Sequence, residues 1–188
     1  MRIILGVGNP GSRYKNNRHN VGFMLLDYLA KSVSVSFSPS KFDYSYSEGS
    51  FNNSDFVLVK PATYVNNSGV AASQALKYYN TPINDLLVIV DDLNLGLASF
   101  RVRASGGDGG HNGVYSIIYH LTSDQFPRIR IGIGNSFEKG SMAQYVLEDF
   151  SKSEINQLEN TFGTCESLVK EFITGGLSSM LNLNSRLR

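Results

Sequence analysis

The chain has 188 residues, 41% of them hydrophobic, and a formal net charge of +1 at pH 7. This length suits a single globular domain, and we expect residues 1–188 to form one. The near-neutral charge excludes nucleic-acid binding through the field of the whole molecule, so any such contact needs a local basic cluster. The one cysteine, Cys165, excludes an internal disulfide and a thiolate metal site.

The first half of the chain alternates predicted strands with predicted helices. Residues 2–5 form a short apolar run, and a Gly-rich loop then leads to a helix from about Val21, where apolar residues recur at helical spacing. Residues 56–59 are uninterrupted apolar residues, as in a strand covered on both faces, and a helix is predicted at about 69–80. Residues 36–55 are rich in Ser, Tyr and Asn and are expected to form a mobile excursion.

The pattern continues through the third quarter of the chain. Residues 86–90 form a second buried strand, and a helix is predicted at about 112–122. Residues 99–103 and 128–131 alternate polar with apolar residues, which suits strands with one wetter face nearer a sheet edge. The alternation predicts an α/β fold with a twisted, mixed but mostly parallel sheet flanked by helices.

A capping box, Ser151–Glu154, begins a C-terminal amphipathic helix, which Gly175–Gly176 is expected to end. Cys165 falls on the apolar face of this helix and is expected to pack in the core. Since the chain also lacks a G-x-S-x-G motif, neither a serine nor a cysteine nucleophile is indicated.

The first loop, Gly6–Gly11, matches the G-x-G-x-x-G pattern of dinucleotide-binding folds. We reject a nicotinamide-cofactor enzyme as the leading interpretation, because Pro10 interrupts the loop and no acidic residue follows at the required distance. The loop instead presents the amide of Asn9 at the carboxyl end of a strand, the edge at which open α/β sheets bind ligands. A tight turn is the alternative explanation of the glycines.

His19, in a polar loop before the first predicted helix, is the best candidate for a general base. Asp91 ends the buried strand and can orient the imidazole, whereas Asp92 points to the opposite face and can equally be a solvated acid. His111, in a Gly-rich turn, stays open as a second candidate, and His120 is expected at the surface. The histidines show no metal-ligand spacing, which predicts attack by water without a metal or other cofactor.

Two further loops offer amides and an aromatic ring at the same edge. Tyr64 and Asn66 follow the second apolar run, and Asn112 lies at the end of the Gly-dense stretch 106–113, where a helix is predicted to start. Helix capping by Asn66, Asn67 or Ser68, and by Asn112, is the alternative to a role in ligand binding.

Arg101 and Arg103 lie on one face of a predicted strand, roughly 6 to 7 Å apart, so both guanidinium groups can hold one phosphate. Arg128 and Arg130 repeat this spacing and can extend the pair into a basic strip. Pairing with local acids is the usual alternative for such arginines.

Six segments in this order resemble the bacterial peptidyl-tRNA hydrolase family: GVGNPGSRY, RHNVGF, KPATYVNNSG, DDLNLG, GGDGGHNG and RIRIGIG. They span about the first three quarters of the chain, and together they are far more specific than any one alone. The resemblance implies a mixed sheet flanked by helices and hydrolysis of the ester that joins a peptide to the terminal ribose of tRNA, which recycles the tRNA for translation. It implies no cofactor, peptidyl-tRNA as the partner, and a monomer. The single cysteine and the lack of a signal-peptide pattern predict a protein of the cytoplasm, and the lack of an apolar stretch long enough to cross a bilayer predicts no membrane role.

The resemblance also implies roles for individual residues. His19 would accept a proton from water, Asp91 would stabilise the basic form of His19, and Asn9 would lie beside the scissile bond. The other matching positions would contact the substrate, with a basic clamp for a tRNA phosphate on the last two: Tyr14, Tyr64, Asn66, Asn112, Arg101 and Arg103.

The sequence departs from the family pattern in two places, with Val65 and Asn67 around the substrate asparagine and Asn94 and Gly96 in the acidic block. These departures leave Asp91 in place and are expected to affect substrate affinity rather than chemistry. A non-enzymatic RNA-binding relative that acts as a splicing cofactor is the alternative function, because such relatives can retain the motifs. The sequence does not decide whether residues 137–148 act as a lid over the site.

Overall fold

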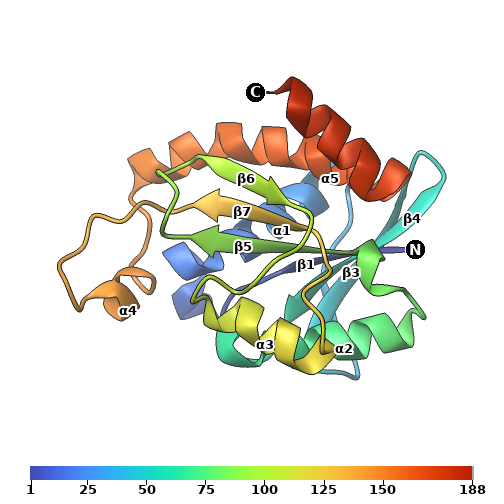
Figure 1. The fold of residues 1–188 in the computed structure, drawn as a ribbon, viewed down its shortest axis with the longest axis horizontal. Coiled ribbons are helices and arrows are strands. Elements are labelled where there is room, and N and C mark those ends of the chain that lie inside the picture. Colours follow the sequence, from blue (N-terminus) through green and yellow to red (C-terminus); the bar gives the residue numbers. More distant parts are fainter. Residues whose placement is uncertain (188) are drawn as a thin grey trace.

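A twisted sheet of seven strands, in the order β2-β3-β4-β1-β5-β7-β6, runs through the computed structural model, which describes residues 1–187 (Figure 1). β1, β4, β5 and β7 pair in parallel, β3 and β6 run antiparallel to their neighbours β4 and β7, and β2 pairs antiparallel with β3 at the edge. The predicted mixed, mostly parallel sheet is therefore confirmed. The strands are β1 (Arg2–Gly6), β2 (Ser38–Pro39), β3 (Tyr44–Phe51), β4 (Ser54–Pro61), β5 (Leu86–Asp92), β6 (Phe100–Arg103) and β7 (Arg128–Gly132).

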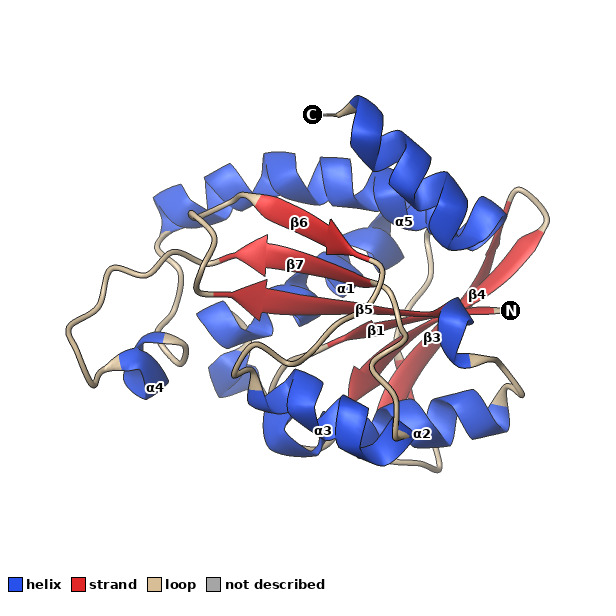
Figure 2. Ribbon diagram, viewed as in Figure 1, coloured by secondary structure: helices blue, strands red, loops and turns tan. Residues whose placement is uncertain are grey.

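Helices cover both faces of this sheet (Figure 2). One face packs against α1 (Val21–Ser32) and α5 (Lys152–Arg186), and the other against α2 (Ser68–Tyr78) and α3 (Asn112–Leu121). The short α4 (Met142–Tyr145) lies in an excursion beyond the carboxyl ends of the strands (Figure 1). Short 3₁₀ helices occupy Ser12–Tyr14, Arg18–Asn20, Val65–Asn67 and Ile83–Asp85.

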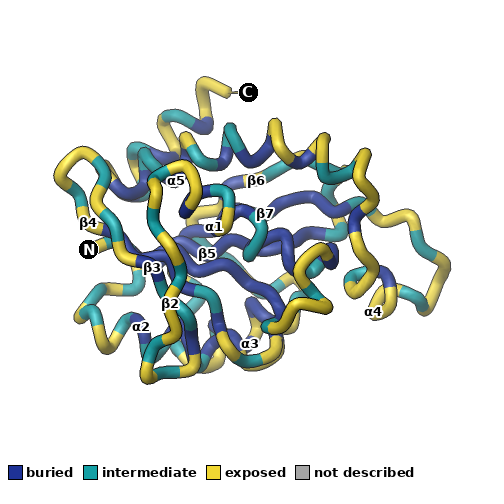
Figure 3. The backbone as a smooth tube through the Cα atoms, turned by 180° about the vertical axis from the view of Figure 1, so that it is seen from behind, coloured by how far each residue is buried: buried dark blue, intermediate teal, exposed yellow. Residues whose placement is uncertain are grey.

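The central strands are buried on both sides, which explains their uninterrupted apolar sequences (Figure 3). Along β5, alternate side chains pack into the two core clusters: Leu87 and Ile89 against α1 and α5, and Val88 and Val90 against α2 and α3. Asp91 and Asp92 end this strand and are buried as well. The expectation that Asp92 can be a solvated acid was therefore wrong.

The expected mobile excursion at residues 36–55 is also wrong, because this segment contains β2 and β3 and the start of β4. Tyr44 and Ser47 of β3 are only 2% exposed, and Tyr44 packs into the core on the α2 side. Asn52 and Asn53 form the turn to β4 with φ values of 49° and 59°, which Asn adopts more readily than most residues. The polar residues belong to a hairpin with one solvated side.

The expectation that Gly175–Gly176 ends the C-terminal helix is wrong. These glycines bend the helix, and the helical segment continues beyond them. Gly176 has φ 70° and ψ −163°, and helical structure resumes and continues to Arg186. Met180, after the bend, is fully buried in the core. The start of α5 at the capping box of Ser151 and Glu154, and the burial of Cys165 on its apolar face, agree with expectation.

The start of α1 is held close to the sheet by a glycine. A Cβ atom on Gly22 would lie 2.6 Å from the carbonyl oxygen of Val7 and 2.7 Å from that of Ile89. Only glycine therefore allows the helix to begin against the carboxyl ends of β1 and β5. This approach places the preceding loop, which carries His19, at the edge where β5 presents Asp91. None of the helices among residues 1–187 is both long enough and apolar enough to span a membrane.

Candidate active site

A cavity of about 600 Å³ opens at the carboxyl ends of the parallel strands. Its polar lining comes from the loops after β1, β4, β5 and β6, and includes Asn9, Asn66, Asp91, His111 and Asn112 as well as His19 before α1. Opposite these residues lies an apolar wall, made of Leu93, Phe137, Met142, Ala143, Val146 and Leu147. The cavity thus combines convergent polar groups with an apolar surface, as ligand sites commonly do.

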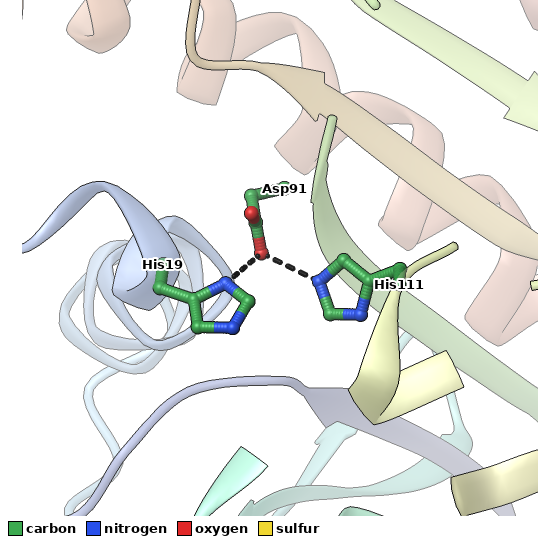
Figure 4. A group of neighbouring side chains, drawn as sticks. All are labelled: His19, Asp91 and His111. Atoms are coloured by element: carbon green, nitrogen blue, oxygen red, sulfur yellow. Dashed lines mark hydrogen bonds and ion pairs between the residues drawn. The ribbon is translucent and has the colours of Figure 1, made fainter. Parts of the chain in front are cut away.

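Asp91 lies between His19 and His111 (Figure 4), and all three residues line the cavity. Its Oδ1 atom is 2.8 Å from His19 Nδ1 and 2.8 Å from His111 Nε2. The carboxylate is only 3% exposed. Burial alone would raise the pKa of Asp91, but the charges and hydrogen bonds of His111 and His19 hold its pKa below the ordinary value. Asp91 is therefore an anion that can orient a histidine and support a positive charge on it.

The tautomer of His111 is fixed by its position at the N-terminus of α3. His111 is the N-cap of this helix, and its Nδ1 accepts hydrogen bonds from the backbone N–H groups of Gly113 (3.1 Å) and Val114 (3.3 Å). Because Nδ1 is an acceptor, the proton of the neutral ring lies on Nε2, which donates to Asp91. His111 can therefore fix the position of the carboxylate, while neither of its nitrogens is left as a free base.

His19 has the opposite arrangement. Its Nδ1 donates to Asp91, so in the neutral ring the lone pair lies on Nε2, which makes no hydrogen bond within residues 1–187. Burial lowers the pKa of His19, but the charge of Asp91 and its hydrogen bond raise the pKa by more, to above 6.5. This is the arrangement of a general base whose tautomer and charged form are both supported by one carboxylate.

Asn9 presents an amide N–H₂ group to the same cavity. The backbone N–H of Val65 donates to Asn9 Oδ1 at 3.0 Å, which assigns the oxygen and leaves Nδ2 as the available donor. Asn20 fixes the loop further, since its side chain bonds both the backbone N–H of Asn9 (2.8 Å) and its carbonyl (2.9 Å). The sequence between this loop and α1 forms 3₁₀ turns, unlike a dinucleotide-binding turn, in which the helix begins within the glycine run.

The other amides and rings that the sequence indicated lie around the mouth of the cavity. Asn66 and Asn112 are exposed and line it, and so does Tyr64. Tyr14 packs edge-on against Tyr64, with ring centroids 6.2 Å apart. The helix-capping alternatives do not apply, because α2 has no side-chain cap hydrogen bond and the N-cap of α3 is His111.

Four arginines of β6 and β7 lie in cross-strand pairs, with Arg101 opposite Arg130 and Arg103 opposite Arg128. Arg130 forms an ion pair with Asp92 (Nε–Oδ2 3.0 Å), and Arg128 is buried and donates to the carbonyl groups of Gly107 and Asp124. Arg101 and Arg103 are exposed, and neither forms an ion pair with any residue in the range 1–187. Of the four arginines, only the side chains of Arg101 and Arg103 are therefore both exposed and without an ion-pair or hydrogen-bond partner within residues 1–187, and the expected extension into a longer basic strip is not seen.

His19, Asp91 and His111 could also be considered as metal ligands, since their candidate ligand atoms lie within 4.8 Å of one another. The hydrogen bonds argue against this. An ion bound by His111 Nε2 would require the proton to move to Nδ1, where it would face the backbone N–H groups of Gly113 and Val114. The observed geometry instead uses both ring N–H groups as donors to one carboxylate.

Sequence reasoning left open whether residues 137–148 act as a lid but did not predict that they supply an apolar wall, and it missed the full environment of His111. The signal for His111 was its place directly before a predicted helix, where a side-chain acceptor caps the backbone. The wall residues Phe137, Met142, Val146 and Leu147 come from a segment without a regular pattern, and only the folded chain brings them to the cavity.

Comparisons with known proteins agree with the geometry. Residues 3–187 match the family model described as peptidyl-tRNA hydrolase. The chain is 43% identical over 178 residues to the peptidyl-tRNA hydrolase of Bacillus subtilis, covering 92% of this chain and 95% of that protein. It is 39% identical over 182 residues to that of a Thermoanaerobacter species, covering 97% and 98%.

A solved structure shows the same fold. The crystal structure of peptidyl-tRNA hydrolase from Acinetobacter baumannii superposes with a TM-score of 0.90 at 31% identity, covering 97% of this chain and 93% of that one. These relatives give no support to the alternative of a non-enzymatic splicing cofactor. The match of the family model over nearly the whole chain, together with these relatives, shows that the chain belongs to the peptidyl-tRNA hydrolase family.

Proposed function

We propose that this protein hydrolyses the ester bond between the peptide and the terminal ribose of peptidyl-tRNA, using a water molecule that His19 activates. The observation that carries the proposal is the hydrogen bond from His19 Nδ1 to the buried Asp91, which leaves Nε2 as a base in the cavity. Family membership supplies the substrate class. No cofactor is required, because the base, its partner and an amide donor all come from the chain.

The reaction proceeds in two proton transfers. His19 Nε2 takes a proton from water as the water oxygen attacks the ester carbonyl, and Asp91 stabilises the imidazolium that results. The amide of Asn9 donates to the carbonyl oxygen as it gains negative charge. The tetrahedral intermediate then collapses, and His19 returns the proton to the ribose oxygen as the ester bond breaks. The products are a peptide carboxylic acid, which then loses its proton to the solvent, and a tRNA with a free terminal hydroxyl.

The residues around the mouth hold the two parts of the substrate. Asn66 and Asn112 offer amide groups to the peptide and the terminal nucleotide, and Tyr14 and Tyr64 flank them. Arg101 and Arg103 bind a phosphate of the tRNA, since both are exposed on one face of β6. We infer that residues 1–188 act as one domain and as a monomer, because one chain supplies every group that the mechanism uses. We also infer that the protein acts in the cytoplasm, because its substrate arises in translation.

The first test is release of peptide from an N-blocked aminoacyl-tRNA by the purified protein, with a chelator present and beside the His19→Ala variant. Turnover by the wild type alone would support a metal-independent hydrolase with His19 as its base. Absence of turnover in the wild type, with tRNA still bound, would contradict the proposal and favour an RNA-binding role.

A further inference from the structure

The loop that carries His19 is joined to the segment before α5 by a short run of backbone hydrogen bonds. The N–H of Arg18 donates to the carbonyl of Glu148 (3.0 Å), and that of His19 donates to the carbonyl of Val146 (2.8 Å). Asn17 forms an isolated antiparallel bridge with Asp149. The catalytic loop therefore has a second point of attachment, in addition to the hydrogen bond between the His19 ring and Asp91.

The side chain of Arg18 fastens the same two segments together. Its Nη1 and Nη2 atoms lie 2.8 and 3.2 Å from the two carboxylate oxygens of Glu154, in the first turn of α5. The guanidinium carbon also lies 4.5 Å from the ring centroid of Tyr145 and 5.0 Å from that of Phe150. Arg18 is only 8% exposed, so these charge-assisted and cation–π contacts are largely shielded from water.

This attachment matters because the fastened segment forms part of the cavity. Val146 and Leu147 belong to the apolar wall, and they lie between Tyr145 and Phe150, the two residues whose rings contact Arg18. Arg18 itself directly precedes the proposed base. The backbone hydrogen bonds of this attachment and the contacts of the Arg18 guanidinium group therefore both act on the separation between the wall and His19 Nε2.

We propose that Arg18 is a positioning residue, which acts through the backbone of His19 and through Tyr145 and Phe150 to hold the base at a fixed distance from the apolar wall. The proposal rests on the proposed function above. An acyl group held against the wall and a water held by His19 meet in a reactive geometry only if this distance is kept. A misplacement of about 1 Å can cost on the order of 10²-fold in rate, so a small displacement is sufficient.

Three variants separate this role from a contribution to stability alone. Arg18→Gln removes the charge and the paired hydrogen bonds. Arg18→Lys keeps the charge but loses the planar fork that binds both carboxylate oxygens. Glu154→Gln preserves the capping box with Ser151, because glutamine also serves at that position, but removes the anion that Arg18 binds.

Lys170→Gln is a matched control on the same helix. Lys170 pairs with Glu166 of α5 (2.5 Å) and lies 5.1 Å from the ring centroid of Phe51, so it combines an ion pair with a cation–π contact, as Arg18 does. Neither Lys170 nor these two partners line the cavity. The change in kcat of Lys170→Gln therefore measures the effect of losing a similar ion pair and cation–π contact that do not position the base.

The experiment measures kcat and KM on N-blocked aminoacyl-tRNA below the melting temperature of every variant, and the pKa of His19 by NMR without substrate. We expect Arg18→Gln to lower kcat by about 10- to 100-fold, with KM changed by less than about threefold, because the phosphate clamp on β6 is untouched. The loss in Arg18→Lys is smaller, Glu154→Gln also lowers kcat, and Lys170→Gln leaves kcat unchanged. The pKa of His19 falls in Arg18→Gln, since the displaced ring no longer forms a well-aligned hydrogen bond with Asp91.

A kcat of folded Arg18→Gln within about twofold of wild type, or a loss confined to KM, would overturn the proposal. If Arg18→Gln does not fold, Arg18→Lys and Glu154→Gln decide by the same criteria. Inactivity of the wild type would instead count against the proposed function. In that case the NMR measurement still tests the positioning role, and an unchanged pKa of His19 in all three variants would contradict it.

Discussion

His19 and His111 hydrogen-bond the same oxygen atom of Asp91, and their ring centroids lie 5.0 Å apart. The two rings nevertheless differ in their hydrogen bonding, because each has its other nitrogen in a different environment. In His111 that nitrogen caps α3, whereas in His19 it lies in the cavity without a hydrogen-bond partner among residues 1–187. The helix cap thus determines which of the two histidines is available as a base.

Replacing His19 by Ala is expected to lower kcat by about 10² to 10⁴-fold, the usual contribution of a positioned general base. Binding of tRNA is expected to stay close to wild type, because the arginines of β6 are unaffected. Single-turnover hydrolysis and a filter-binding assay measure the two effects separately. His120→Ala is the matched control, since His120 is exposed and its side chain hydrogen-bonds only the carbonyl of Ser116 among residues 1–187. Comparable activity of the two variants would contradict the assignment of the base.

The pH dependence of the reaction tests the role of Asp91. Asp91 raises the pKa of His19 above the ordinary value of 6.5. We therefore expect kcat/KM of the wild type to fall as the pH drops through the raised pKa of His19. Asp91→Asn removes the charge but leaves burial, which lowers the pKa of His19, so the acidic limb of the profile moves to lower pH. The plateau rate also falls, since the imidazolium loses its anionic partner. A limb that stays in place or moves to higher pH would show that Asp91 does not set this pKa.

Much of the architecture could be predicted because strong local signals determine it. The run Leu86–Val90 has no polar alternation, and such a strand must be covered on both faces, which implies helices on each side of a parallel sheet. The carboxyl ends of parallel strands meet at one edge, so the ends of the first and central predicted strands bring Asn9 and Asp91 together. His19 and Asp91 are 72 residues apart in the chain, yet the fold places His19 Nδ1 2.8 Å from Asp91 Oδ1.

What could not be predicted depends on contacts between distant segments. The sequence of β3 is polar because one side of this strand is solvated, and one of its two buried positions is Ser47, which no hydrophobic pattern marks as buried. The pairing of Asp92 with Arg130 follows from the register of β5 and β7, and the pairing of Arg18 with Glu154 spans 136 residues. Gly176 has the left-handed φ that usually ends a helix, and only the apolar residues after it show that the chain returns to the core.

Two substitutions of His111 are expected to separate its two hydrogen-bonding roles. His111→Asn keeps an N-cap for α3, because Asn is a strong capping residue, but shortens the side chain so that it no longer reaches Asp91. His111→Ala loses the cap as well, which costs about 1 kcal/mol more in the free energy of unfolding. Both variants are expected to lower kcat by a similar factor, since both leave Asp91 with one donor. Urea unfolding and turnover assays measure the two quantities, and a kcat of His111→Asn equal to wild type would contradict a role in holding Asp91.

The phosphate clamp is tested by the salt dependence of tRNA binding. Arg101→Ala and Arg103→Ala each remove an exposed cation, and each is expected to reduce the slope of log K against log salt concentration by about 0.7 to 0.9, as loss of one phosphate contact does. The affinity for full-length tRNA falls, whereas hydrolysis of a short substrate that ends in the same ester is unchanged. Lys31→Ala is the control, because Lys31 is exposed at the end of α1, on the opposite face of the sheet. A slope that is the same in the arginine variants and in this control would exclude the clamp, and the phosphate contact would then have to be sought elsewhere around the mouth of the cavity.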